Sequence, residues 1–118
     1  MIYLDTHVVA WLYAGRADLL GARARTLINA EELRISPMVV LELEYLREID
    51  RLAVGGKVIV KRLGGELGMQ VCDMPFPEIV DAAIAQGWTC DPFDRLIVGH
   101  AAAARSVLVT KDAAIRRH

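Results

Sequence analysis

The sequence has only two cysteines, Cys72 and Cys90, and they form no CxxC pair. Two unclustered thiols offer neither a disulfide framework nor a cysteine-ligated zinc site, and they suit a reducing cytoplasm. No apolar run approaches the ~20 residues of a membrane span. Residues 1–4 read as the start of a strand and not as a basic leader, so we expect no signal peptide. We therefore expect a cytoplasmic protein without a membrane segment.

The chain also lacks an excess of charge of either sign. Its 14 Lys and Arg residues stand against 15 Asp and Glu residues, which gives a formal net charge of −1. This balance by itself argues against a protein that binds nucleic acid through overall charge. Basic residues are nevertheless grouped within residues 47–62 and 111–117, and they would outnumber the acids if several acids were metal ligands. These groups are either ordinary solvated faces or contacts for a phosphate backbone.

The sequence contains enough hydrophobic residues to form the core of one well-packed domain. It has 118 residues, of which 54% are hydrophobic, so we expect a single domain over residues 1–118 with a substantial core. Apolar runs typical of strands alternate with stretches of helical periodicity. The strands are expected at residues 1–4, 33–35, 69–72 and 107–109, and the helices begin at residue 8 and span 19–30, 38–52, 57–67, 78–86 and 92–104. This alternation predicts an α/β fold, a mostly parallel sheet with helices on both faces.

Two helix starts carry clear local signals. In Ser36-Pro37 and Asp91-Pro92, a capping side chain precedes a proline at the first helical position, where its missing N–H costs nothing. The helix that follows Asp91 is apolar or small almost throughout to Ala104, which predicts a buried helix with acids at its amino-terminal end.

Four acids occupy positions that call for an explanation. Asp5 and Asp112 each follow a strand, Asp94 begins the buried helix, and Glu42 falls in the apolar face of the helix over 38–52. That face is predicted to contain Met38, Val39, Leu46, Ile49 and Ala53. An ionised carboxylate there is costly unless it is paired or coordinated, so Glu42 is either a ligand or half of an ion pair, for example with an arginine. Helix capping is the other reading of Asp5, Asp91 and Asp112.

The predicted fold brings these acids together. The carboxyl ends of parallel strands meet at one edge of a sheet, so side chains distant in sequence can share a cleft there. Four crowded carboxylates repel one another, and a divalent cation relieves that repulsion. Ligation by carboxylates without cysteine or histidine favours Mg²⁺ or Mn²⁺, which can activate water against a phosphodiester. Thr110 is placed to add a hydroxyl to this cluster.

Four segments in order and spacing resemble the PIN-domain family, and within it the VapC toxins of type II VapBC toxin–antitoxin modules: residues 4–8, 35–37 leading to 41–43, 91–97, and 109–112. The resemblance implies a three-layer α/β/α domain and a Mg²⁺- or Mn²⁺-dependent endoribonuclease. Asp5, Glu42, Asp94 and Asp112 would be its acidic quartet, with Thr110, Asp91 and Thr6 as auxiliary residues.

The resemblance also implies partners: a homodimer, a VapB-type antitoxin that joins it in a heterotetramer or larger assembly, and an RNA substrate, since family members cut structured RNA such as tRNA. Chains of the family usually run a few residues further into a last short strand, whereas this sequence stops at His118, which leaves the edge of the sheet and the setting of Asp112 open.

Other classes explain the sequence less well. A phosphoacceptor receiver domain would use Asp73 as acceptor and Lys111 as its basic partner, but it gives no role to Glu42 or Asp94. A haloacid-dehalogenase-like phosphatase would need a second acid at the position of His7. A catalytically inactive PIN-fold binding module stays open, although it would be expected to have lost one of the four acids.

Overall fold

The structure, a computed structural model, describes residues 1–110 and 115–116. The strands are β1 (Ile2–Leu4), β2 (Leu33–Ile35), β3 (Gln70–Val71), β4 (Val107–Val109) and β5 (Ile115–Arg116). The helices are α1 (Thr6–Tyr13), α2 (Ala22–Ala30), α3 (Pro37–Glu48), α4 (Gly56–Leu67), α5 (Phe76–Ile84) and α6 (Pro92–Ala103), with a 3₁₀ turn, η1, at Ala17–Leu19. None of the helices in these residues is long and apolar enough to cross a membrane.

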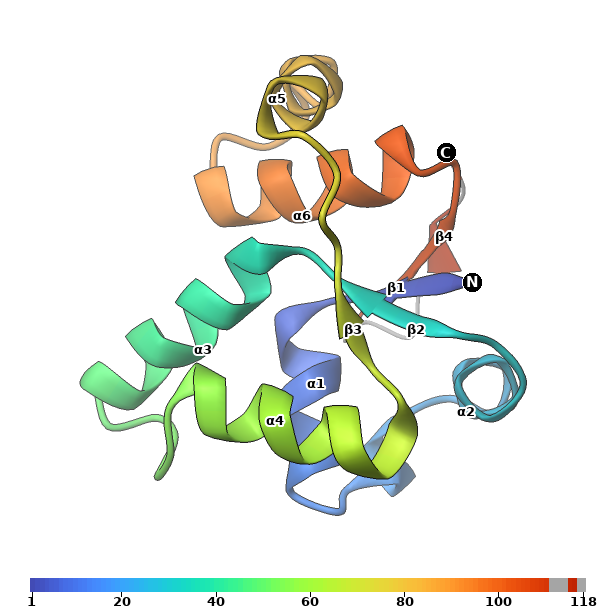
Figure 1. The fold of residues 1–118 in the computed structure, drawn as a ribbon, viewed down its shortest axis with the longest axis vertical. Coiled ribbons are helices and arrows are strands. Elements are labelled where there is room, and N and C mark those ends of the chain that lie inside the picture. The colour runs from blue at the N-terminus through green and yellow to red at the C-terminus, as the bar shows by residue number, and fades with distance from the viewer. Residues whose placement is uncertain (111–114, 117–118) are drawn as a thin grey trace.

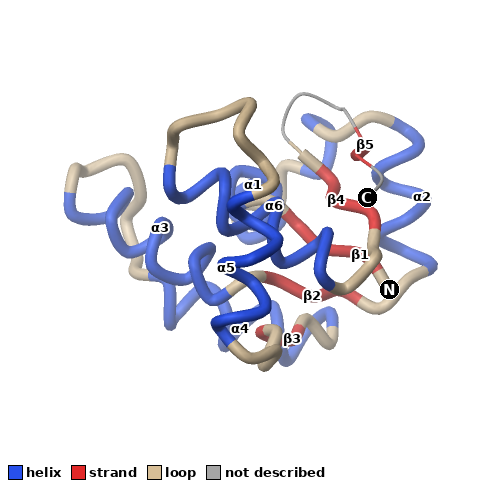
Figure 2. The backbone as a smooth tube through the Cα atoms, turned by 90° about the horizontal axis from the view of Figure 1, so that it is seen from above, coloured by secondary structure: helices blue, strands red, loops and turns tan. Residues whose placement is uncertain are grey.

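The sheet has the order β3-β2-β1-β4-β5. The first four strands are parallel, and β5 runs antiparallel to β4. In Figure 1, α5 and α6 lie on one side of the sheet and α1 and α4 on the other, which gives the predicted α/β/α layers. Figure 2 shows the strands from above, with helices around them. The α/β fold with a mostly parallel sheet is therefore confirmed.

Strand order reverses beside β1. The chain passes from β1 to β2 and β3 in one direction, and it then returns to place β4 on the other side of β1. In an open α/β sheet, a crevice forms at the carboxyl ends of the strands where the order changes in this way. Asp5 and Thr110 directly follow the two strands that flank this point.

The predicted capping signals are confirmed. The Ser36 hydroxyl accepts a hydrogen bond from the Met38 backbone N–H at 3.1 Å, and the Asp91 carboxylate accepts one from Phe93 N–H at 2.8 Å. Gly68 ends α4 in the left-handed conformation, with φ of 69°. Buried side chains from both faces of the sheet form the core, and α6 contributes the stretch Ile97 to Ala101 to it.

One helix is shorter than predicted, and its buried face is different. α3 ends at Glu48, whereas the sequence predicted a helix to residue 52. Asp50 adopts a left-handed backbone with φ of 61°, so the chain turns away. Helical spacing no longer applies past that turn, and Ile49 and Ala53 are exposed. The residues of α3 that are buried are Val39 and Leu43, with Glu42 on the half-buried border beside them.

Two further predictions were wrong. Residues 19–21 were expected to open a helix, but Leu19 closes the 3₁₀ turn and α2 starts at Ala22. The helix predicted over residues 78–86 also has other bounds, because α5 spans Phe76–Ile84. The short strand β5, which pairs with β4, was not predicted. Two residues are too few to show a strand pattern in the sequence.

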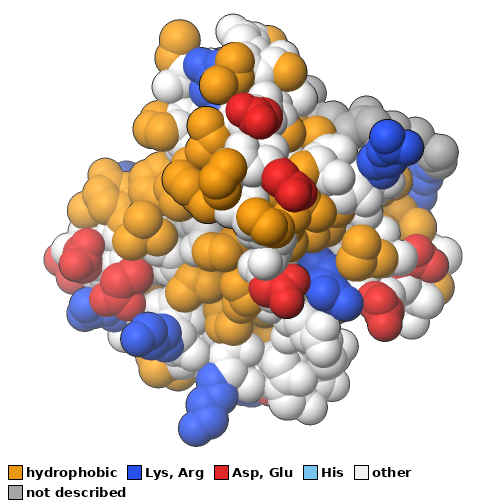
Figure 3. All heavy atoms as spheres, turned by 45° about the horizontal axis from the view of Figure 1, so that its top comes forward, with side chains coloured by type: hydrophobic (Ala, Val, Ile, Leu, Met, Phe, Trp, Pro, Cys, Tyr) orange, Lys and Arg blue, Asp and Glu red, His pale blue; other side chains and the backbone are white. Residues whose placement is uncertain are grey.

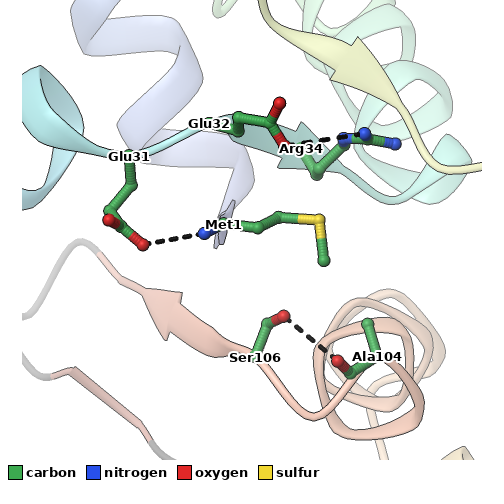
Figure 4. A network of polar contacts seen from close by, with 6 residues as sticks. All are labelled: Met1, Glu31, Glu32, Arg34, Ala104 and Ser106. Carbon is green, nitrogen blue, oxygen red and sulfur yellow. Dashed lines mark hydrogen bonds and ion pairs between the residues drawn. The ribbon is translucent and has the colours of Figure 1, made fainter.

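The sheet edge away from the crevice is held by polar contacts (Figure 4). The amino group of Met1 lies 2.7 Å from Glu31, Arg34 lies 3.9 Å from Glu32, and the Ser106 hydroxyl donates to the Ala104 carbonyl at 3.2 Å. All of these are at the amino-terminal ends of strands. Surface ion pairs of this kind contribute little stability.

Candidate functional site: an acidic cleft at the carboxyl edge of the sheet

A cleft of about 260 Å³ lies where the strand order reverses. We call it the acidic cleft. Its polar lining consists of Asp5, His7, Glu42, Asp91, Asp94 and Thr110, and its apolar lining consists of Trp88, Ile97, Val98 and Leu108. These residues come from segments that are distant in sequence, at residues 5–7, 42, 88–98 and 108–110, so the fold assembles them.

Asp5 links β1 to the start of α1. Its backbone N–H donates to the Val109 carbonyl at 3.0 Å, which joins the carboxyl ends of β1 and β4. Its side chain caps α1 by accepting from the Thr6 backbone N–H at 2.6 Å. The capping reading and the site reading of Asp5 are therefore both compatible with the structure, since a carboxylate has two oxygens and several lone pairs.

Glu42 reaches the cleft from α3 and is held there by a hydroxyl. The fully buried Thr6 side chain donates from Oγ1 to Glu42 Oε1 at 2.5 Å. The ion pair with an arginine that the sequence left open is not found among residues 1–110, where the threonine hydroxyl is the hydrogen-bond donor to Glu42. This bond fixes one oxygen of the carboxylate and ties α3 to α1 beside Asp5.

The electrostatics of Glu42 show how close the acids are. Burial raises its pKa above the usual value, and the charges of Asp5 and Asp94 raise it further. The hydrogen bond from Thr6 and the nearby His7 act in the opposite direction. A carboxyl group in this position is short of positive charge, and a cation in the cleft would supply it.

The start of α6 supplies two acids with different tasks. Asp91 accepts backbone N–H bonds from Phe93 at 2.8 Å and from Asp94 at 3.4 Å, so it is the cap of the helix as well as a residue of the cleft rim. Asp94 lies in the first turn of the helix and lines the cleft. The capping reading of Asp91 is therefore confirmed, and its auxiliary role at the site stays a prediction.

The structure thus brings Asp5, Glu42, Asp94, Asp91 and Thr110 to one cleft, with Thr6 directly behind Glu42. Thr110 follows β4 and is buried. Asp112, the fourth predicted acid, lies outside the described residues.

The chemistry of the lining fits a hard divalent cation. Its donors are carboxylate and hydroxyl oxygens, which Mg²⁺ and Mn²⁺ prefer. Within residues 1–110 and 115–116, no three acids, histidines or cysteines are close enough together to form a ready-made metal cage. A cation that keeps several of its waters does not need such a cage, because water fills the remaining positions.

Three features of this region were not predicted. His7 and the apolar wall formed with Ile97 line the cleft, although only acids and threonine hydroxyls had been expected there. Arg95, next to Asp94, points the other way and donates to the carbonyls of Ala83 and Ile84 at 3.2 and 3.0 Å, which closes the end of α5. The sequence pattern does not distinguish an arginine that caps the end of a neighbouring helix from an arginine of the binding site.

The structure does not favour the receiver interpretation. Asp73, its acceptor, lines a different cavity together with Tyr3, Arg34 and Cys72. Cys72 is a buried free thiol, as predicted, and burial raises the pKa of the neighbouring Tyr3. Glu42 and Asp94, to which a receiver domain gives no role, both line the acidic cleft.

The protein is therefore an α/β domain whose carboxylates gather in a cleft where the strand order of the sheet reverses. The chain belongs to the PIN domain family, whose sequence model matches residues 2–118. It is 29% identical over 119 residues to ribonuclease VapC22 of Mycobacterium tuberculosis, an alignment that covers 99% of this chain and 91% of that protein.

A solved structure has the same fold. The crystal structure of VapBC2 from Rickettsia felis, bound to a DNA fragment from their promoter, superposes with a TM-score of 0.61. The match covers 93% of this chain and 87% of that one at 21% identity. The predicted resemblance to VapC-type PIN domains is confirmed by these comparisons.

Proposed function

We propose that the chain is a metal-dependent endoribonuclease and the toxin of a type II toxin–antitoxin module, acting in the cytoplasm as one PIN domain over residues 1–118. The observation that carries the proposal is Glu42, a half-buried carboxylate that Thr6 holds beside Asp5 and Asp94. The similarity to a protein named as a ribonuclease supports the same reading.

In this proposal Asp5, Glu42 and Asp94, with Asp112, hold Mg²⁺ or Mn²⁺. When bound, such a cation supplies an activated water and stabilises charge on the phosphodiester. Thr6 fixes the Glu42 carboxylate, and Asp91 sets the start of α6 and so the position of Asp94. The substrate would be structured RNA such as tRNA.

The proposed protein partners are a VapB-type antitoxin and a second copy of the chain. Exposed hydrophobic side chains that lie near one another support such contacts, since contiguous apolar patches on a protein surface often mark protein–protein interaction sites. They include Leu41 and Tyr45 on α3 and Ile84 on α5, and Figure 3 shows hydrophobic side chains gathered over this part of the molecule. A groove of about 760 Å³ between α3 and α4, lined by Val40, Leu41 and Val58 among others, fits a partner helix.

A metal titration tests the site independently of any RNA. Mn²⁺ at millimolar concentration should raise the melting temperature, because a ligand that binds only the folded state stabilises it. Glu42→Gln should keep the fold and lose most of this rise. Glu44→Gln is the matched control on the same helix, since Glu44 pairs with Arg47 outside the cleft. Equal metal effects on the wild type and Glu42→Gln would remove Glu42 from the site.

A further inference from the structure

Trp88 is the unusual residue of the acidic cleft. It lies between α5 and α6, lines the cleft together with Asp91 and Asp94, and is 55% exposed. A tryptophan side chain is on average highly buried in folded proteins. One that is left more than half exposed on the wall of a polar cleft offers a large aromatic surface to a ligand.

Local hydrogen bonds orient the indole. Its Nε1–H donates to the Gln86 side-chain oxygen at 2.8 Å, so the polar edge of the ring is already satisfied within the loop. The same loop is tied to α6, because the Asp91 backbone N–H donates to the Thr89 hydroxyl at 3.3 Å. These bonds hold the loop that carries the ring against the start of α6, and the indole N–H needs no polar partner from a ligand.

The negative charge of the cleft favours an uncharged aromatic surface as the contact for RNA. Among the described lining residues there is no lysine or arginine, and four of them are acids: Asp5, Glu42, Asp91 and Asp94. None of these side chains offers a positive charge to an RNA phosphate, so the lining by itself supplies no favourable phosphate contact. Stacking of a base on an aromatic ring does not depend on charge and accepts any base.

We infer that Trp88 stacks on an RNA base next to the phosphate that enters the acidic cleft. It acts as a positioning residue and takes no part in bond cleavage. This inference rests on the proposed ribonuclease function. Inside a duplex both faces of a base are covered by its neighbours, so the contact requires an unpaired nucleotide from a single strand or a loop.

Binding can be measured without cleavage. Trp11 and Trp88 are the two tryptophans of the chain, so Trp11→Phe leaves Trp88 as the only indole. In EDTA, titration of this variant with a fluorescein-labelled single-stranded RNA oligonucleotide should quench indole fluorescence in step with the rise in fluorescein anisotropy. A duplex of the same sequence should quench much less. RNA that binds without quenching, or a duplex that quenches equally, would overturn the inference.

Steady-state cleavage with Mn²⁺ gives the second test. Trp88→Leu should raise KM roughly five- to hundredfold, the usual range for the loss of one base–aromatic stack, and change kcat much less. Trp88→Phe should restore most of the affinity. Phe76→Leu is the control, because Phe76 is also an exposed aromatic residue but does not line the cleft. An unchanged KM for Trp88→Leu would overturn the inference.

The outcomes separate the two proposals. A wild type that binds single-stranded RNA with quenching but never cuts it with Mn²⁺ would refute the nuclease function and support the stacking. A wild type that cuts, together with a Trp88→Leu variant that cuts with the same KM but changes its oligomeric state in light scattering, would assign Trp88 to an interface between copies and overturn the inference.

Discussion

Replacing Thr6 by valine removes one hydroxyl and almost no volume. Thr6 is fully buried, and its Oγ1 donates to Glu42 at 2.5 Å, so the substitution takes away the hydrogen-bond donor that fixes this carboxylate. The backbone N–H of Thr6, which donates to the capping carboxylate of Asp5, is unchanged by the substitution. The change therefore isolates the orientation of Glu42 from the helix start beside it.

The size of the effect follows from what the hydroxyl does. A hydrogen bond to a charged group contributes about 1.5–3 kcal/mol, and loss of a partner that orients a metal ligand usually reduces metal affinity or activity about 10- to 100-fold. We expect Thr6→Val to fall in that range for metal-dependent RNA cleavage. Its far-ultraviolet circular dichroism should match that of the wild type.

The assay is the initial rate of cleavage of a fluorophore–quencher RNA as a function of Mn²⁺ concentration. Thr6→Ser is the matched control, since serine keeps the hydroxyl and loses a methyl group, at a cost of about 1 kcal/mol in stability. It should cleave at close to the wild-type rate. If Thr6→Val were as active as the wild type at every Mn²⁺ concentration, the argument that Thr6 orients Glu42 would be refuted.

Two further predictions concern the fold. Gly56→Ala should destabilise the protein by roughly 1–3 kcal/mol or more in urea unfolding, because the added Cβ would lie 2.2 Å from the Val40 carbonyl oxygen. Gly65→Ala lies in the same helix with nothing within 4 Å of the added Cβ, so it should instead stabilise the protein by about 0.5–1 kcal/mol. Equal effects of the two substitutions would contradict this packing. Burial lowers the pKa of His100, so the unfolded chain binds its proton first and stability should fall as pH drops below about 6.5, by at most ~1.4 kcal/mol per pH unit. His100→Gln should flatten this part of the stability curve, and an unchanged slope would show that another group causes it.

Much of the fold was predictable because its signals are local. Ser36-Pro37 and Asp91-Pro92 mark helix starts through side chains that satisfy nearby N–H groups, and Gly68 marks a helix end through its backbone. These signals need no knowledge of the tertiary structure. The convergence of Asp5, Glu42 and Asp94 was predictable for another reason, since parallel strands place their carboxyl ends at one edge.

The details that failed depend on contacts across the fold. The end of α3 is set by the left-handed turn at Asp50, which no apolar spacing indicates. The donor to Glu42 is Thr6, 36 residues away in sequence, and a threonine at that position looks like any other residue at a helix start. Arg95 is beside Asp94 in sequence but serves the end of α5, which only the packing of two helices determines.

The most direct measurement is RNA cleavage by the purified, antitoxin-free chain with Mn²⁺, with Mg²⁺ and with EDTA, comparing the wild type with Asp94→Asn. Asp81→Asn is the control, because Asp81 is an exposed acid on α5 outside the cleft. The account predicts cleavage that requires a divalent metal, disappears in Asp94→Asn and persists in Asp81→Asn. Cleavage that continues in EDTA, or that is equal in the wild type and Asp94→Asn, would contradict it.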